Sequence, residues 1–380
     1  MKSLRQMQPA AVVALLLAVL PVWLATSSFR AQLPPEIMFP SAALTRIQRL
    51  SDFNPALAGT PGDTDVYVFE GAEPGGSLLV LGGTHATEIA GTMTAVLLVE
   101  TLDVQTGKVF VVPRANASAA THTMPGEAHP QFITIPTPAG SRRFRYGARY
   151  TNPVHQRRDP VVFRHPASPR ILQGCEARNL NRVYPGAQDG TLTERVAWAI
   201  VELIRLERVD VAFDLHEAPP ERNLVNAIVA PEPSQDIAPQ ATIMLQLAGW
   251  DFHLESSSAE FRGLSHREWA DATATRPFLM ETANPVQGHL RGRTTARLAV
   301  TGRDDQYATA ARRGLLAMPY DSTGIALETR VSRHLAGIAA IVDLYNGKAP
   351  SARIDMGGWP DAGPLQDNGL GRYLGSAVDD

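Results

Sequence analysis

Short runs of branched apolar residues alternate along the chain with segments of helical periodicity, and no other feature limits the possible folds as strongly. The runs predict strands and the periodic segments predict helices. In chain order we expect strands at 66–69 and 78–82, a helix at 88–102, a strand at 109–112, a helix at 192–206, strands at 209–215 and 224–230, a helix at 237–247 and a strand at 277–281. This alternation is typical of α/β proteins, in which helices cover both faces of a mostly buried sheet.

Composition excludes several classes of protein. The 380 residues allow one large domain or two ordinary ones, and 44% apolar with 19% charged residues argues against a disordered chain, a coiled coil or a multi-span membrane protein. A formal net charge of −3 provides no general positive field, so we expect no nucleic-acid partner. The single cysteine, Cys175, can form neither an internal disulfide nor a structural zinc cluster.

The N-terminus has the pattern of a targeting segment. Two cations precede an apolar run at 9–25, and residues 25–27 fit a small-residue cleavage site. The run contains Pro21 and is shorter than the about 20 residues that comfortably span a bilayer. We therefore favour a cleaved signal peptide over an uncleaved anchor, with a buried helix as the third reading. Removal of residues 1–27 would change the net charge from −3 to −5, so we expect an exported protein, periplasmic or extracellular, or one anchored to the membrane by this segment.

A long segment, 116–178, separates the two halves of the α/β pattern. Loops of this length in a compact domain are usually functional or disordered. One explanation is a surface loop that happens to be basic, and the other is a rim that attracts an anionic substrate. Ten arginines stand against two acids, Asp159 and Glu176, between 142 and 182: Arg142, Arg143, Arg145, Arg149, Arg157, Arg158, Arg164, Arg170, Arg178 and Arg182.

Polar residues follow the strand at 78–82. Gly82 and Gly83 allow a sharp turn, which places His85 and Glu88 at the carboxyl edge of the sheet, where α/β proteins bind ligands. An imidazole and a carboxylate three residues apart can converge on one metal ion. Alternatively, Glu88 caps the helix that follows.

His216 occupies the equivalent position after the strand at 209–215. Two histidines and a carboxylate with one open position are typical of a catalytic rather than a structural zinc site. The alternative for His216 is a hydrogen-bonded core histidine. Asp214 either orients an imidazole or points outward.

Five motifs occur in the order found in the zinc carboxypeptidase superfamily, and the set resembles its succinylglutamate desuccinylase/aspartoacylase branch. Each motif falls at a predicted strand end or loop, and together they span about 78–288. The resemblance implies a zinc carboxypeptidase-like central mixed sheet flanked by helices, and one zinc ion per chain bound by His85, Glu88 and His216. The motifs are Gly82-Gly83-Thr84-His85-x-x-Glu88, Pro113–Asn116, Asn179–Gly186, Asp214–Glu217 and Met280–Gly288.

The resemblance also implies roles for residues outside the metal site. Asn181 and Arg182 match residues that hold a substrate carboxylate, and a guanidinium pairs bidentately with a carboxylate. One arginine of the family precedes this pair. Arg178 and Arg170 lie nearby without the expected spacing, and we keep Arg178 as a candidate substrate-binding residue.

Glu281 matches the general base of the family, at the end of an apolar strand where burial and a nearby dication can tune a carboxylate. Glu328 is a competing candidate, because 324–328 looks like a short strand ahead of a helix at 333–344. Residues 328–330 fit equally well as the opening of that helix. We favour Glu281.

Two departures from the family leave the substrate open. The basic segment is longer than in typical deacylases, and the region after Gly288 looks helical where family acylases often add a β-rich domain. The segment 261–268 is either a substrate loop or a plain turn.

We therefore expect a signal peptide or anchor at 1–27, a hydrolase domain at 28–348 with a basic insert at 117–177, and a Gly/Pro-rich tail at 349–380 that wraps or frays. The expected reaction is zinc-dependent cleavage of an amide bond in a small anionic substrate, as in N-acyl amino acid deacylases. The alternatives are a metallocarboxypeptidase acting on exported peptides or cell-wall fragments and a non-catalytic zinc- or solute-binding protein. We expect membrane contact only through the N-terminal segment.

Overall fold

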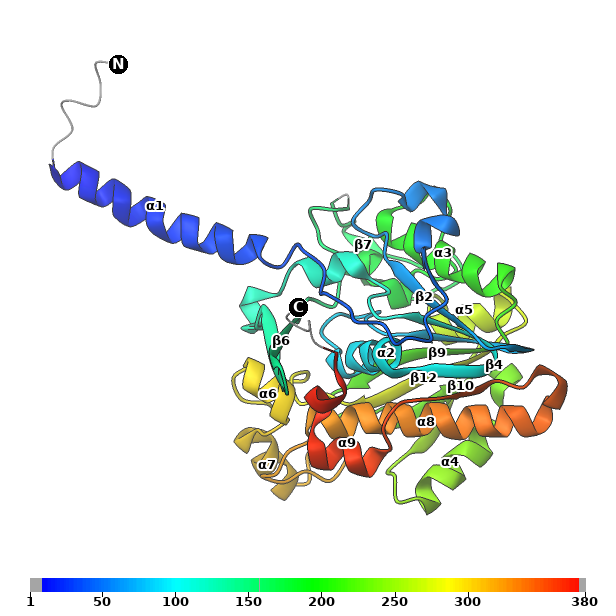
Figure 1. Cartoon of the computed structure of the whole chain (residues 1–380). Helices are drawn as coiled ribbons and strands as arrows, with labels where there is room; N and C mark the ends of the chain where they lie inside the picture. Colours follow the sequence, from blue (N-terminus) through cyan, green and yellow to red (C-terminus); the bar gives the residue numbers. More distant parts are fainter. Residues whose placement is uncertain (1–8, 157, 376–380) are drawn as a thin grey trace.

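The computed structural model describes residues 9–156 and 158–375 (Figure 1). Three parts of the sequence predictions lie outside the described residues. They are the cations Lys2 and Arg5 of the targeting segment, Arg157 of the basic segment, and residues 376–380 of the tail.

A nine-stranded mixed sheet forms the centre of the molecule. Its strands are β1 (Arg46–Arg49), β2 (Asp65–Glu70), β3 (Glu73–Leu81), β4 (Asp103–Val112), β9 (Val211–Ala218), β10 (Ala227–Ala230), β11 (His253–Ser256), β12 (Arg276–Ala283) and β13 (Asp355–Gly357). The order is β1-β2-β4-β3-β9-β12-β10-β11, and β13 pairs with β4. Neighbours in the β4-β3-β9-β12 centre are parallel, whereas β1, β2, β10 and β13 add antiparallel pairs. The predicted α/β fold with a central mixed sheet is therefore confirmed.

Helices cover both faces of this sheet (Figure 1). Helices α2 (Ile89–Thr101), α4 (Ala238–Leu247) and α8 (Leu327–Lys348) pack on one face, and α3 (Leu192–Leu206) and α5 (Ser265–Ala272) pack on the other. The helices predicted at 88–102, 192–206 and 237–247 are confirmed. Four shorter helices were not assigned in the sequence analysis: α5, α6 (Ala296–Thr301), α7 (Asp305–Arg312) and α9 (Ala362–Asn368).

The short strand predicted at 324–328 is wrong. Helix α8 begins at Leu327, so Glu328 lies in its first turn, which is the alternative that the sequence left open. The apolar residues that suggested a strand, Ile325 and Leu327, are buried against other parts of the fold instead.

Strand alternation decides which residues of β9 and β12 face the same side of the sheet. Phe213 and Phe278 stack with ring centroids 5.6 Å apart, in the core that includes α2 and α8. Successive side chains of a strand point to opposite faces, so Asp214, His216 and Glu281 face the side of α3 and α5. Glu281 is paired in register with His216. The side chains of His216 and Glu281 are therefore neighbours on the same face of the sheet, near the carboxyl ends of β9 and β12.

The basic segment contains strands that the sequence analysis missed. Strands β5 (Phe132–Thr137) and β6 (Gly140–Arg145) form a hairpin, and β7 (Val162–Phe163) pairs with β8 (Leu172–Gln173). Arg142 forms an ion pair with Glu100 at 2.6 Å, and Arg145 forms one with Glu36 at 2.7 Å. The expectation of a substrate rim is therefore wrong for these two arginines, because acids from outside the segment neutralise them.

Helix α1 (Pro9–Arg30) extends away from the domain (Figure 1). It has 22 residues, none of its most apolar 18-residue window is buried, and it is long and apolar enough to cross a membrane. The reading as a buried helix is therefore wrong. Whether this helix is a cleaved signal or a retained anchor stays a prediction.

The tail packs against the domain over residues 349–375. Strand β13 pairs with β4, and α9 packs against α8. Over these residues the tail wraps rather than frays. The predicted domain limits stay a prediction.

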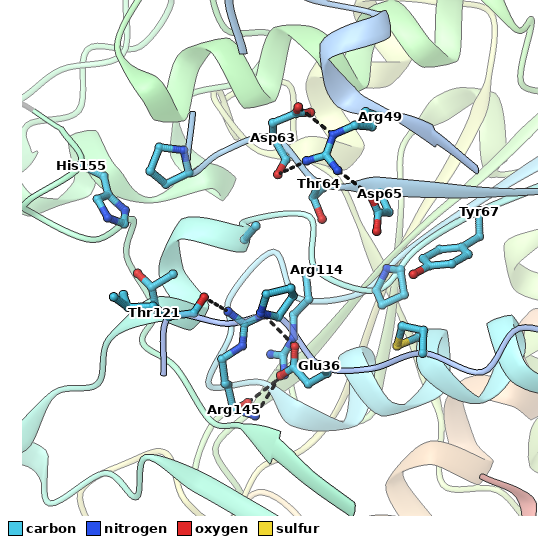
Figure 2. A pocket seen from close by; sticks show the side chains of 16 residues that line it. Glu36, Arg49, Asp63, Thr64, Asp65, Tyr67, Arg114, Thr121, Arg145 and His155 are labelled. Carbon is cyan, nitrogen blue, oxygen red and sulfur yellow. Dashed lines mark hydrogen bonds and ion pairs between the residues drawn. The ribbon is translucent and has the colours of Figure 1, made fainter. Parts of the chain in front are cut away.

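One carboxylate fixes the linker after α1 to the domain. Glu36 lies between Arg114 and Arg145, with Nη2 to carboxylate oxygen distances of 2.5 Å and 2.7 Å (Figure 2). Burial by itself would raise the pKa of Glu36, but the charge of Arg114, the charge of Arg145 and the hydrogen bonds from Arg145 outweigh it and lower the pKa to about 2. The ionised carboxylate therefore stabilises the folded chain.

We expect Glu36→Gln to lower the free energy of unfolding by about 3 kcal/mol at pH 7, the usual scale for removing one partner of a buried ion pair. The folded-state pKa lies below the value of about 4.3 for an unfolded glutamate, so this stabilisation is present above that pH and is lost as the pH falls towards 2. Urea unfolding of the detergent-solubilised chain at several pH values measures it.

The matched control is Glu70→Gln, which breaks a more exposed pair with Arg46. Exposed pairs contribute at most about 1 kcal/mol, so this variant should remain close to the parent. A Glu36→Gln effect that stays constant from neutral to acidic pH would contradict the assignment.

Candidate metal centre and active site

His85, Glu88 and His216 come together at the carboxyl edge of β3 and β9. Nδ1 of His85 lies 2.8 Å from Oε1 of Glu88, and Nδ1 of His216 lies 2.7 Å from Oε2 of the same carboxylate. The candidate ligand atoms of the three residues all lie within 4.8 Å of one another, and each residue is only 2% exposed. The structure therefore brings the three predicted ligands into one buried cluster.

The turn after β3 places His85 and Glu88. Gly83 has φ +71°, and a Cβ added to it would lie 2.9 Å from the Pro113 carbonyl oxygen, so this position favours glycine. Glu88 occupies the N-cap position of α2, but within the described residues its side chain makes no capping hydrogen bond. The carboxylate instead lies within hydrogen-bond distance of Nδ1 of both histidines and accepts the backbone N–H of Glu217 at 3.2 Å. The capping alternative for the Glu88 side chain is therefore wrong.

Oxygen atoms lie against the second nitrogen of each imidazole. Nε2 of His85 lies 2.8 Å from Oδ1 of Asn179. Nε2 of His216 lies 2.8 Å from Oδ2 of Asp214, although the angle at this contact falls outside hydrogen-bond geometry. Asp214 is held by the hydroxyls of Thr84, at 2.7 Å, and Ser265, at 2.5 Å. Contacts of this kind set the tautomer of a metal-binding histidine and direct its other nitrogen to the metal.

The donor set fits zinc. Two imidazoles and one carboxylate are the ligands of many catalytic zinc sites, which leave a further position for water or substrate. Burial lowers the pKa of His85 to about 4, and the charge of Arg149 acts in the same direction. His85 is therefore neutral at pH 7, as a metal ligand must be, whereas Asp214 and Glu88 outweigh burial and raise the pKa of His216, so His216 has to release a proton when a metal binds.

Glu281 lies beside this cluster at the end of β12. It is 7% exposed, and its Oε2 is buried with no hydrogen-bond partner in the part of the chain that the structure describes. Burial raises the pKa of Glu281 to about 8, with His216 acting to lower it and Glu88 to raise it. A buried carboxylate with a raised pKa and an unpartnered oxygen has the properties of a proton-transfer group. In contrast, Glu328 accepts the backbone N–H of Leu370 at 3.4 Å.

Asn181 and Arg182 form a second polar cluster. Oδ1 of Asn181 accepts the backbone N–H of Ser265 at 2.8 Å, which leaves the amide nitrogen as a donor. The side chain of Arg182 is 28% exposed, and its Nε lies 3.6 Å from Glu176. Adjacent residues thus provide an amide donor and a partly exposed guanidinium, which can together bind a carboxylate.

Ser265 connects the two clusters. Its backbone N–H binds Asn181, and its hydroxyl binds Asp214, which contacts His216. Ser265 is the first residue of α5, so the segment 261–268 is not a plain turn. It fixes the Asn181 amide relative to the candidate metal ligands.

Arg178 does not join either cluster. Its Nε and Nη2 donate to Asp159 at 2.7 Å and 2.8 Å, and its Nη1 donates to the Thr151 carbonyl at 2.6 Å. These bonds hold the basic segment together in this structure, and the substrate-binding role of Arg178 stays a prediction.

Two residues reach the metal cluster without having been assigned a role from the sequence. Nη1 of Arg149 lies 2.9 Å from Oε1 of Glu88, and Nε2 of Gln287 donates to the same oxygen at 3.1 Å. Gln287 belongs to the motif 280–288, which offered a signal. Arg149 stands in the basic segment at no recognisable spacing from the Asn-Arg pair.

Residues 74–284 match the succinylglutamate desuccinylase/aspartoacylase catalytic domain family. A search of curated proteins gave no match.

Solved structures resemble the chain at low identity. They include a succinylglutamate desuccinylase from Silicibacter sp. TM1040, with 16% identity, 73% of this chain and 60% of that chain covered, and a TM-score of 0.41. The tripeptide-bound Cell Shape Determinant Csd4 protein from Helicobacter pylori has 13% identity, 81% and 59% coverage, and a TM-score of 0.49. The product-bound Ectoine utilization protein EutE (DoeB) from Ruegeria pomeroyi has 18% identity, 60% and 55% coverage, and a TM-score of 0.35.

The chain thus spans about 60% or less of the length of these three proteins, and the family match carries the assignment. That match covers more than half of the 380 residues and includes the strands that hold the candidate metal ligands. The chain therefore belongs to the succinylglutamate desuccinylase/aspartoacylase family of hydrolases.

Proposed function

We propose that this chain is a zinc-dependent hydrolase that cleaves the amide bond of a small carboxylate-bearing substrate, as an N-acyl amino acid deacylase does. The observation that carries the proposal is the buried cluster of His85, Glu88 and His216 beside Glu281, whose Oε2 has no hydrogen-bond partner among the described residues. A hydrolase needs a site that activates water and a group that moves its proton, and this cluster offers the residues for both.

Three residues of the cluster would hold the ion, and two more would orient them. His85, Glu88 and His216 are the ligands, while Asn179 and Asp214 lie against the imidazole nitrogens that face away from it. When bound, zinc would lower the pKa of a water molecule and polarise the substrate carbonyl.

Glu281 moves the proton. Its carboxylate takes a proton from the attacking water, whose oxygen bonds to the carbonyl carbon of the substrate. When the carbon–nitrogen bond breaks, the same residue returns the proton to the departing amine. The raised pKa of Glu281 supports this role, because a group that must hold a proton in mid-reaction needs a pKa near the working pH.

Two arginines are expected to contact the substrate, one at its carboxylate and one at the carbonyl oxygen where negative charge develops. Arg182 with Asn181 binds the substrate carboxylate, since a guanidinium and an amide donate several hydrogen bonds to one carboxylate. Arg149, whose Nη1 lies 2.9 Å from Glu88, is placed to donate to the carbonyl oxygen as negative charge develops on it.

We expect Arg182→Lys to lower kcat/KM by about 10- to 100-fold for an N-acyl amino acid with a free carboxylate, because an ammonium cannot reproduce a planar pair of charged hydrogen bonds. A substrate in which the carboxylate is replaced by a neutral amide should be affected little. The loss should persist from about 0.05 to 1 M salt, since a largely buried pair is only partly screened.

The matched control is Arg170→Lys, at an exposed arginine of the same basic segment, which should behave like the parent. Equal turnover of the acid and the neutral amide by the parent protein would refute carboxylate anchoring and leave only the metal-dependent hydrolysis. Substrates that carry the carboxylate on the acyl part or on the leaving amino acid separate a deacylase from a carboxypeptidase.

A further inference from the structure

Exposed aliphatic side chains gather in one part of the basic segment, residues 158–173, which contains β7 and β8 and is called the arm below. Val161 is 97% exposed, Val162 46% and Ile171 56%. Single exposed aliphatic residues are ordinary, but three within one short arm indicate a surface that contacts something else.

The pleat of the β7–β8 pair separates an inner from an outer face. Phe163 pairs with Leu172, and Phe163 packs against the core on the α3 side of the sheet. Val162 precedes Phe163 in β7 and pairs with Gln173, so these two residues occupy the opposite, outer face, and Ile171 lies directly before β8. A strand pair with one face in water normally carries polar residues there. Packing within the chain therefore does not account for the outer aliphatic residues.

The arm is also positively charged. Arg158, Arg164 and Arg170 are exposed, and the acid of the arm, Asp159, forms an ion pair with Arg178. Aliphatic side chains interspersed with exposed arginines match the chemistry of an anionic membrane surface, where apolar groups enter the headgroup boundary and cations meet phosphates.

The base of the arm lies close to the linker that follows α1. His155, next to the 82% exposed Val154, lines a cavity of about 420 Å³ together with Leu33 and Glu36 (Figure 2). Glu36 is clamped to the domain by two arginines, and only residues 31–35 separate it from the end of α1. A bilayer crossed by α1 is therefore within reach of this side of the domain.

We propose that α1 is a retained anchor rather than a cleaved signal, and that the arm lies on the anionic surface of the membrane that α1 then crosses, with Val161, Val162 and Ile171 at the headgroup boundary. Because α1 holds the arm near the bilayer, the effective concentration is high and a weak contact is enough. The arm leads directly into the Asn179–Arg182 segment, so this contact places the rim of the site at the membrane. The membrane contact of the arm is independent of the chemistry of the metal centre, and it adds to the membrane contact expected from the N-terminal segment.

The test uses the full chain with Cys175→Ser and a new cysteine, Val161→Cys, that carries an environment-sensitive fluorophore. The protein is reconstituted into phosphatidylcholine vesicles with about one third phosphatidylglycerol. We expect a blue-shifted emission and, with a quencher attached to the lipids, quenching at least about twofold stronger than at a site away from the membrane. Both effects should weaken without phosphatidylglycerol, at ~1 M salt, or when Arg164 and Arg170 are changed to Gln.

The control site is Leu247→Cys, which is 84% exposed on α4, at the opposite end of the molecule from α1 in Figure 1. Since both labelled positions are exposed, neither change should disturb the fold. A Val161 label that behaves like the Leu247 label in anionic vesicles would overturn the proposal. A shift of the Val161 label caused by a soluble peptide without lipid would also overturn it, by assigning the arm to a peptide partner.

Discussion

His216→Ala should remove the bound zinc and lower kcat/KM by at least about 1000-fold, because a catalytic metal stabilises the transition state by several kcal/mol and each 1.36 kcal/mol is a factor of ten. His216 offers one of the three candidate ligand atoms, and the cysteine of the chain, Cys175, is not part of the cluster. Elemental analysis after dialysis measures the zinc content, and circular dichroism checks the fold.

Two further variants make this result specific to the metal. His216→Asn retains a polar group beside Asp214, so it tests loss of the ligand even if the alanine variant folds poorly. Asp214→Asn keeps all three ligands and removes only the charge against Nε2, and we expect zinc affinity to fall by about 10- to 100-fold. Full zinc occupancy in a His85→Ala, His216→Ala double variant would refute the site.

The sheet could be predicted from the sequence because its central strands are buried on both faces. Such strands are continuous apolar runs, and the runs at 78–82, 209–215 and 277–281 correspond to β3, β9 and β12. In the β5–β6 hairpin, which was missed, three of the six residues of β6 are arginines. Its position depends on ion pairs with distant acids, such as Arg142 with Glu100, which no local pattern contains.

The candidate metal ligands could be predicted for a related reason. Each lies just beyond or at the end of a central strand, and parallel strands end at one edge of a sheet, so His85 and His216 had to lie near each other. Arg149 reaches Glu88 from an irregular loop. Because a loop has no regular geometry, the number of residues between two positions does not predict how far apart they lie in space. The ion pair of Arg178 with Asp159 joins two parts of the same segment that no local sequence pattern relates.

Glu281→Gln should lower kcat by at least about 100-fold while zinc content and fold remain unchanged, since general-base catalysis contributes on the order of 10²- to 10⁴-fold. Glutamine has the shape of glutamate but cannot take a proton from water. The substitution should cost little stability, because Oε2 of Glu281 makes no hydrogen bond to the described residues.

The pH dependence gives an independent readout of the same residue. A general base must be deprotonated, so activity that depends on Glu281 rises as the pH passes its pKa and is lost below it. Burial raises the pKa of Glu281 to about 8 in the protein without metal, and a bound dication favours the carboxylate. The acidic limb of kcat/KM should therefore lie below pH 8 in the zinc-loaded protein, and it should be absent from the residual activity of Glu281→Gln.

Glu328→Gln is the matched control, because it makes the same chemical change in the carboxylate that accepts the Leu370 N–H in the C-terminal segment. This variant should retain kcat and the acidic limb. If Glu328→Gln is inactive and Glu281→Gln is nearly normal, the base has been assigned to the wrong glutamate. If both variants are active and keep the acidic limb, neither carboxylate is the base, and the titrating group must be sought among the other side chains around the metal cluster.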